Sequence, residues 1–109
     1  MFTEYNLCVS LTSLPTKEKE MFATFTDWSM DNPEEGVKTA EEIWPEMKAA
    51  GAINMRIVKT DDTGARSMTM WPDEPTAMKA IDAMRAKGAA KSGSEVVGSA
   101  MGTVLAEMD

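Results

Sequence analysis

Apolar and polar side chains alternate along several short segments of the chain, which is the period-two pattern of β-strands. The first such segment is Tyr5–Ser13, and we expect the last strand over Val96–Glu107. Two further stretches, residues 53–58 and 65–71, flank the compact turn Asp61-Asp62-Thr63-Gly64. The pattern therefore predicts two separate strands and a central β-hairpin.

Apolar residues spaced by three and four predict helices between these strands. The first helix is expected over residues 16–30. The second begins at Pro33, because a proline followed by two glutamates suits a first helical turn, and it stops at Gly51. We expect a kink or break at Trp44, directly before Pro45. The third helix is expected over about 75–87, followed by a loop of mostly small residues over 88–94.

The predicted order is strand, long helical section, hairpin, helix and strand. This order divides into two split βαβ halves, which is the arrangement of a ferredoxin-like fold. We therefore expect an α+β fold: an antiparallel sheet of β-α-β-β-α-β order with helices on one face. The 109 residues suit a single domain spanning 1–109.

Composition narrows the classes of partner and location. The formal charge of −7 and the absence of a Lys/Arg cluster argue against nucleic acid and against anionic membranes as partners. No apolar stretch approaches the roughly 20 residues of a membrane span, and the start of the chain lacks a secretory signal pattern. Cys8 is the only cysteine, which excludes an intrachain disulfide. We expect a cytoplasmic protein with no metal site and no cofactor.

The sheet face away from the helices is predicted to be covered. Residues 5–15 and 96–106 contain no charged side chain, although a solvated face normally carries Lys, Glu or Thr. If Met101 faces the helices, the outward residues of the last strand are small or weakly polar: Val96, Gly98, Ala100, Gly102 and Val104. Burial against an identical sheet predicts a homodimer. The alternative is an exposed face of small residues.

The strand order, the length and the uncharged outer face resemble the dimeric α+β barrel superfamily. Residues 55–84, where a strand and hairpin lead into Trp71-Pro72 and an Ala/Met-rich helix, are the most similar part. The superfamily includes cofactor-free monooxygenases of antibiotic biosynthesis, haem-degrading monooxygenases and lactone isomerases. The resemblance implies an apolar cavity between the sheet and the helices of each protomer, and it implies no particular reaction.

Candidate pocket residues are mostly methionines and aromatic residues. The chain has eleven methionines, which either fill the core or form an adaptable wall around an apolar ligand. The residues that we expect to line a pocket are Tyr5, Leu7, Phe22, Phe25, Trp44, Met47, Met55, Met68, Met70 and Met101.

Candidate catalytic residues are few. Arg56 lies on a strand with few other charges, where it either occupies the sheet edge or anchors a carboxylate or enolate. Tyr5 and Trp71 are candidates beside it, because the resemblance implies Asn, Trp, Tyr and Arg around the substrate of a cofactor-free monooxygenase. The chain has no histidine, which removes the most common general base and argues against histidine-ligated haem.

Two functional hypotheses follow. The first is a homodimeric protein that binds a small apolar or amphipathic molecule, fatty-acid-like or aromatic, between sheet and helices. The alternative is a cofactor-free monooxygenase or isomerase acting on an aromatic or polyketide-like substrate.

Overall fold

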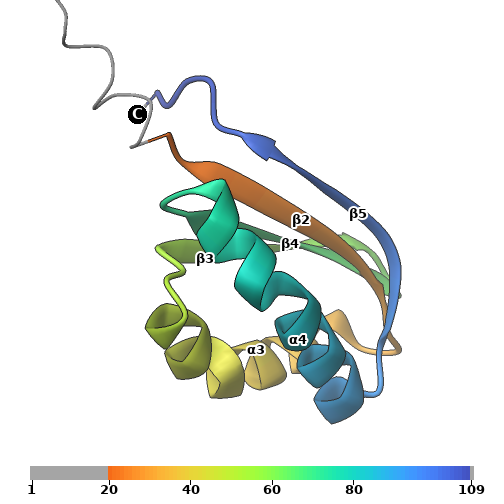
Figure 1. The fold of residues 1–109 in the computed structure, drawn as a ribbon. Coiled ribbons are helices and arrows are strands. Elements are labelled where there is room, and N and C mark those ends of the chain that lie inside the picture. Colours follow the sequence, from red (N-terminus) through yellow and green to blue (C-terminus); the bar gives the residue numbers. More distant parts are fainter. Residues whose placement is uncertain (1–19, 109) are drawn as a thin grey trace, which may run out of the picture.

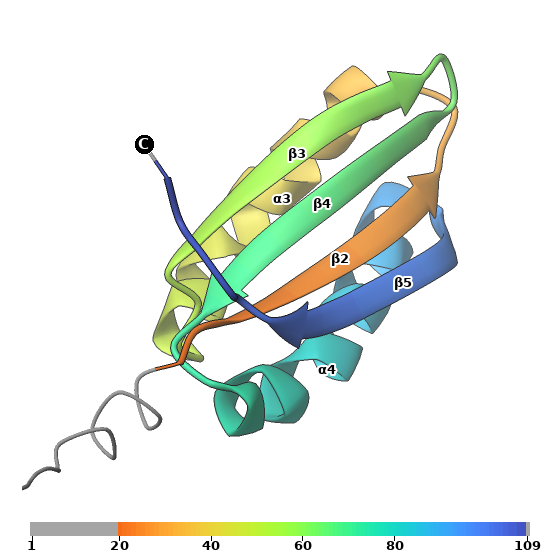
Figure 2. The same ribbon diagram turned by 90° about the horizontal axis from the view of Figure 1, so that it is seen from above.

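The computed structural model describes residues 20–108. Its elements are β2 Phe22–Ser29, α3 Pro33–Ala49, β3 Asn54–Asp61, β4 Gly64–Trp71, α4 Glu74–Ser92 and β5 Glu95–Thr103. The four strands form one antiparallel sheet in the order β3-β4-β2-β5. Helices α3 and α4 cover the same face of this sheet (Figure 1), and within residues 20–108 the other face carries no helix (Figure 2). The predicted ferredoxin-like α+β fold is confirmed.

The first strand of the described residues is β2, which corrects the helix predicted over 16–30. Phe22, Phe25 and Trp28 fit a helical spacing, but their neighbours Thr24 and Thr26 are β-branched, and such a composition favours a strand. Strand β2 pairs with β4 on one side and β5 on the other. The strand predicted at Tyr5–Ser13 lies outside the described residues.

Helix α3 begins at Pro33 as predicted and ends at Ala49, close to the stop predicted at Gly51. The Asn32 side chain accepts hydrogen bonds from the backbone N–H groups of Glu34 and Glu35, which caps the helix. The helix runs unbroken through Pro45, so the predicted break is wrong. Pro45 is solvent-exposed, and the flanking Ile43 and Met47 are buried and hold this turn on the core.

Helix α4 begins with Asp73 as its cap and ends one turn later than predicted. The Asp73 carboxylate accepts a hydrogen bond from the Thr76 N–H at 2.9 Å. Hydrogen bonding to the Thr76 side chain and, after it, to this N–H lowers the pKa of Asp73. Residues 88–92 are helical, so the loop predicted over 88–94 is wrong there. The helix stops at Gly93, whose φ of +70° suits a glycine cap.

The strand pairing assigns each side chain to one of two faces, since directly opposed residues project to the same side. We call the face under the helices the inner face and the uncovered one the outer face. The inner face includes Thr24, Thr26, Trp28, Met55, Ile57, Ala65, Ser67, Thr69, Trp71 and Met101. The outer face includes Ala23, Phe25, Asp27, Asn54, Arg56, Val58, Arg66, Met68, Met70, Gly98, Ala100 and Gly102.

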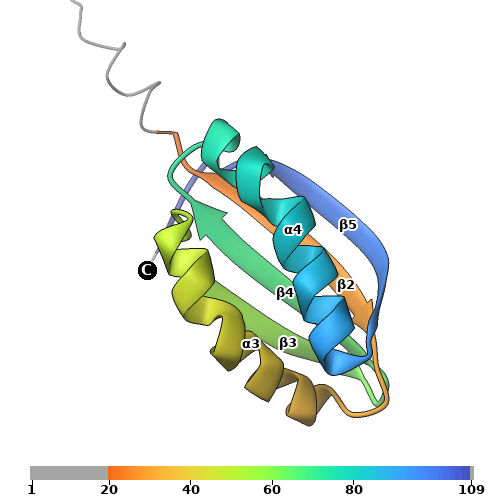
Figure 3. The same cartoon turned by 60° about the horizontal axis from the view of Figure 1, so that its bottom comes forward.

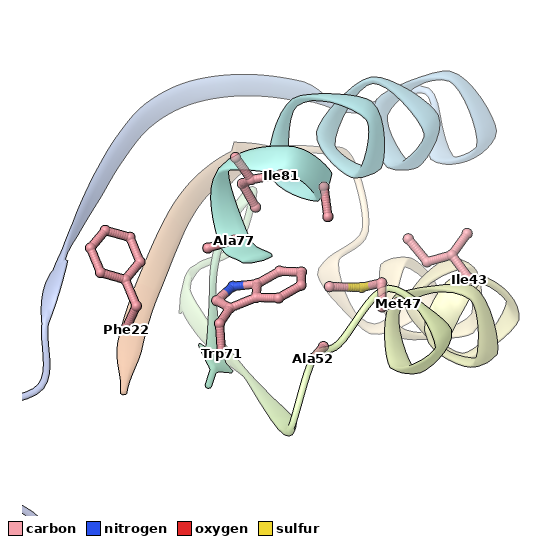
Figure 4. Packing of buried hydrophobic residues seen from close by; sticks show 8 residues of the cluster. Phe22, Ile43, Met47, Ala52, Trp71, Ala77 and Ile81 are labelled. Atoms are coloured by element: carbon pink, nitrogen blue, oxygen red, sulfur yellow. The ribbon is translucent and has the colours of Figure 1, made fainter. Parts of the chain in front are cut away.

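The core is centred on Trp71, which is completely buried. Its indole lies between the sheet and residues of both helices, including Met47 and Ala77 (Figure 4). The indole Nε1 donates a buried hydrogen bond to the Thr24 hydroxyl at 2.9 Å. This bond links the last inner-face residue of β4 to the neighbouring strand β2, so the polar part of the largest core side chain is satisfied. Neither of the two helices is long and apolar enough to cross a membrane.

Replacing the acceptor of this bond is predicted to destabilise the fold. Thr24→Val keeps the shape of the side chain but leaves the indole N–H buried without a partner, which costs about 1–3 kcal/mol. Urea denaturation measures the loss. In a Trp71→Phe background the same Thr24 substitution is expected to cost much less, because no donor remains. Equal costs in the two backgrounds would contradict a role for the hydrogen bond.

Candidate functional site

A cavity lies between the inner face of the sheet and the two helices. Its volume is about 70 Å³, which is well below the roughly 300–1,000 Å³ of pockets that hold drug-sized ligands. Its apolar wall includes Met30, Ile43, Met47, Met55, Ile57, Ala65, Ile81 and Met84. Its polar lining includes Thr26, Trp28, Thr39, Ser67, Thr69, Arg85, Ser92 and Ser94. We call this cavity the pocket.

Arg85 of α4 is the charged residue of the pocket wall. Its Nε donates to the Thr26 hydroxyl at 2.9 Å, and its Nη2 donates to the Phe25 carbonyl at 3.1 Å. These bonds hold the partly buried guanidinium against β2. Within residues 20–108, no carboxylate lies within 4.0 Å of it. The pocket lining contains no Asp, Glu, Lys, Tyr or Cys within this range, so Arg85 is its one ionisable group there.

Trp28 forms another part of the pocket wall. Its indole Nε1 donates to the Ser67 hydroxyl at 3.0 Å, which fixes the ring across β2 and β4. Helix α4 passes close to the same ring at Gly88. A Cβ atom added to Gly88 would lie 3.2 Å from the ring atom Cη2 of Trp28, so a larger residue at 88 would crowd the indole. The glycine lets the helix approach the sheet here.

A second, more open cavity lies beside the pocket, between α3 and the edge strand β3. Its volume is about 530 Å³, and we call it the groove. It is lined by Val37, Ala40, Glu41, Trp44, Asn54, Met55 and Ile57. Three of these residues, Ala40, Met55 and Ile57, also line the pocket. The two cavities are therefore neighbours that share part of their walls.

Ion pairs join the elements around the pocket. Lys87 of α4 pairs with Glu46 of α3, and Lys91 pairs with Glu42 at 3.5 Å, so the two helices are bridged along their length. Figure 3 shows these helices side by side over the sheet, with α3 on the β3 side.

A third ion pair connects α3 with β3. Lys59 donates to the Glu34 carboxylate at 3.0 Å, which ties the first turn of α3 to the edge strand and lowers the pKa of Glu34. All of these pairs are partly exposed, so they orient the helices more than they stabilise the fold.

The outer face carries a separate charged cluster. Arg66 makes a two-pronged contact with Asp27, with Nε donating to Oδ1 at 2.7 Å and Nη2 to Oδ2 at 3.0 Å. The hydrogen bonds from Arg66 lower the pKa of the Asp27 carboxyl and raise the pKa of Arg66 itself. The Arg66 guanidinium also lies 5.7 Å from the centroid of the Phe25 ring. Both charges are thus satisfied on the strands that they connect.

The structure distributes the residues predicted for the pocket over several places. Met47 and Met55 line the pocket, and Trp44 lines the groove. Phe22 belongs to the core cluster. Met101 is on the inner face of β5, is 40% exposed and lines neither cavity. The outer face carries Phe25, Met68 and Met70. Tyr5 and Leu7 lie outside the described residues.

The candidate catalytic residues do not come together. Arg56 is exposed on the outer face of edge strand β3, opposite Met68. Trp71 is a core residue on the inner face, where its indole N–H is already bonded to Thr24. Tyr5 again lies outside the described residues. The arginine that lines the pocket is Arg85.

Sequence reasoning missed Arg85, although a signal was present. Arg85 follows Ile81 by four residues and precedes Gly88 by three, so it shares the buried stripe of α4. A charged residue inside an apolar stripe is costly unless it has a polar partner or a role. Thr26 was missed for another reason, because its segment was interpreted as a helix.

Groups of three or more residues that could hold a metal ion do not occur among residues 20–108. No protein-family model matches the chain, and no curated protein matches it.

Several solved structures share the fold. SnoaB from Streptomyces nogalater, a cofactor-independent oxygenase, is 11% identical with a TM-score of 0.59, covering 83% of this chain and 96% of that chain. ActVA-Orf6 of Streptomyces coelicolor, a monooxygenase solved with nanaomycin D, is 14% identical with a TM-score of 0.57, covering 83% and 92%. A dimeric ferredoxin-like protein from an uncultured marine organism is 14% identical with a TM-score of 0.55, covering 84% and 94%. The similarity in fold predicted from the sequence is confirmed.

Proposed function

We propose that the protein is a homodimer that binds a small amphipathic molecule with one acidic group in the pocket of each protomer. The observation that carries this proposal is Arg85, a guanidinium on the wall of a mostly apolar cavity. The acidic group of the ligand would meet Arg85, and its apolar part would lie against the methionine and isoleucine side chains. Fatty-acid-like and aromatic acids both have this chemistry.

The charge of the chain makes the position of Arg85 informative. The net charge is −7, so an anion approaching the protein is repelled overall. A partly buried cation is also costly unless an opposite charge accompanies it. Arg85 has hydroxyl and carbonyl acceptors only, among residues 20–108. An anionic ligand would add the missing negative charge, and the fork of N–H groups suits a carboxylate or an enolate.

Replacing Arg85 is predicted to weaken the binding of acids selectively. Wild-type protein should bind octanoate more tightly than octanol in isothermal titration calorimetry. Arg85→Met should weaken octanoate binding by about 10- to 100-fold, because charge-assisted hydrogen bonds contribute about 1.5–3 kcal/mol. Octanol binding should change little.

Arg56→Met provides the matched control, since Arg56 is exposed on the other face of the sheet. It should leave octanoate binding unchanged. If the Arg56 variant lost binding and the Arg85 variant kept it, the assignment of the anion to Arg85 would be wrong.

The homodimer is proposed through the outer face. Phe25 and Met68 give this face partly exposed apolar side chains, and glycine and alanine residues of β5 keep it flat at one edge. Ala23 and Met70 of the same face are already buried within the chain. Leu105 and Met108, beyond the end of β5, are 95% and 88% exposed. Such apolar surface favours association. A protein of the same fold is described as dimeric, which supports this proposal.

A charge placed in the centre of the outer face is predicted to separate the protomers. Met68→Lys should weaken dimerisation by about tenfold or more, because the ammonium would be buried beside Arg56, which pairs with residue 68 on the same face and carries the same charge. Sedimentation velocity at several concentrations measures this. Met78→Lys, at a position on α4 that is 49% exposed, should leave the dimer intact. A wild-type protein that stays monomeric at micromolar concentrations would refute the dimer.

The second candidate function is a cofactor-free monooxygenase. It is favoured by the shared fold with SnoaB and ActVA-Orf6, which are described as oxygenases. In this reaction a CH₂ group flanked by aromatic rings becomes a carbonyl: one atom of O₂ enters the product, the other leaves as water, and the substrate supplies all the electrons. Arg85 would stabilise the substrate enolate. The pocket lining offers no carboxylate, lysine or tyrosine as a base within residues 20–108, so the substrate would have to ionise without one.

Oxygen consumption tests this candidate. With dithranol, a dihydroxyanthrone, the enzyme should accelerate uptake of one O₂ per substrate oxidised to the quinone. Arg85→Met should lower the rate by about tenfold or more, because the enolate loses its cation. No protein-dependent uptake with a panel of anthrones and hydroquinones would reject the oxygenase and leave the binding function standing.

A further inference from the structure

The pocket and the groove are separated only by side chains. Ala40 of α3 and Met55 and Ile57 of β3 line both cavities. The pocket measures about 70 Å³ and the groove about 530 Å³. Moving one of the shared side chains would therefore join a small cavity to a larger and more open one.

The sheet and the two helices form the other sides of the pocket. Below it, β3, β4, β2 and β5 are linked by continuous strand pairing. Above it, α3 and α4 are bridged by the Lys87–Glu46 and Lys91–Glu42 pairs. The gap between α3 and β3 is tied at both ends, by the loop 50–53 that joins the two elements and by the Lys59–Glu34 pair. Between these ends lies the groove, along an edge strand whose residues are largely exposed.

Of the three shared side chains, Met55 is the one suited to move. Ala40 has only a methyl group, and the β-branched side chain of Ile57 is restricted at χ1. Methionine is unbranched and has several rotatable bonds, so it changes shape at little cost. Met55 is partly buried and packs against the core cluster, so its side chain forms part of the wall between the two cavities.

We propose that Met55 is a movable partition, that ligands reach the pocket from the groove between α3 and β3, and that Met55 limits the width of the ligand. This inference rests on the proposed binding function. It also predicts how the ligand lies. Thr26, which holds Arg85, is in the same cross-strand row as Ser67 and Ile57. Two strand spacings separate Thr26 from Ile57, or roughly 10 Å.

The ligand class follows from this row. An acidic group at Arg85 leaves roughly 10 Å for an apolar tail that passes the partition and ends beside Trp44 and Val37 in the groove. Glu41 on the groove wall would repel a second anionic group at the far end. The structure thus favours an acid with a single charge and an apolar tail over a dicarboxylate.

Two acids of different width test the partition. Octanoate is narrow and naphthoate is broad, and both carry one carboxylate. Met55→Ala should raise the affinity for naphthoate relative to octanoate by about tenfold, and Met55→Phe should lower it by a similar factor. Met78→Ala is the matched control, because Met78 is exposed and lines neither cavity. It should leave both affinities unchanged.

A second variant tests the flexibility of the side chain at position 55 while keeping its volume nearly unchanged. Met55→Ile has a similar volume but a stiff, β-branched side chain. In stopped-flow measurements it should slow octanoate association by about tenfold while keeping the fold, as checked by urea denaturation.

The outcomes distinguish this inference from the proposed function. If wild-type protein binds octanoate and none of the Met55 variants changes width selectivity or association rate, the partition is refuted and the binding function stands. If suberate, the dicarboxylate of octanoate's length, binds as tightly as octanoate, the predicted position of the tail is wrong. If wild-type protein binds neither acid, both the partition and the binding function are overturned.

Discussion

The arrangement of sheet and helices depends on the buried Trp71 side chain. It ends strand β4, fills the space between the sheet and both helices, and directs its one polar atom to Thr24 on the next strand. A polar atom buried at this depth must be satisfied, so the hydrogen bond fixes the register in which β2 and β4 meet. The same register places Thr26 beside Ser67 and Trp28 beside Ala65, which together form the floor of the pocket. The pocket is therefore a consequence of how the core is paired.

The hydrogen-bond partners of an arginine determine whether its guanidinium can still attract an anion. Arg85 reaches from α4 to the strand beneath it, where it is held by a hydroxyl and a carbonyl. Arg66, by contrast, has a carboxylate partner at bonding distance and lies on the opposite face. Both side chains carry the same charge, and their hydrogen-bond partners determine whether that charge is balanced. A guanidinium paired with Asp27 is electrostatically complete, whereas one held by neutral acceptors can still attract an anion.

Features encoded locally were predictable from the sequence, and features that depend on distant contacts were not. Asn32 and Pro33 mark the start of α3, and the Asp61–Gly64 turn marks the hairpin, because neighbouring residues alone determine these elements. The spacing of Phe22, Phe25 and Trp28 fits both a helix and a strand, and pairing with β4 and β5 decides in favour of the strand. Neighbouring residues also did not reveal that Gly88 belongs to α4. The glycine is needed there because the helix passes close to Trp28 of β2, a contact between distant parts of the chain. The candidate site was the least predictable feature, because the position of Arg85 in the pocket wall depends on its hydrogen bonds to Thr26 and Phe25 of the distant strand β2.

The three tryptophans of the chain occupy three different environments. Trp71 is sealed in the core, Trp28 lines the pocket with its N–H on Ser67, and Trp44 lines the groove. Indole fluorescence depends on the polarity around the ring, so the core, the pocket and the groove each contain one tryptophan whose emission reports on that environment. Single-tryptophan versions of the protein would therefore show separately whether a molecule has arrived in the groove, has moved into the pocket, or has disturbed the core. The chain thus contains the means to test the proposed path of a ligand without any added label.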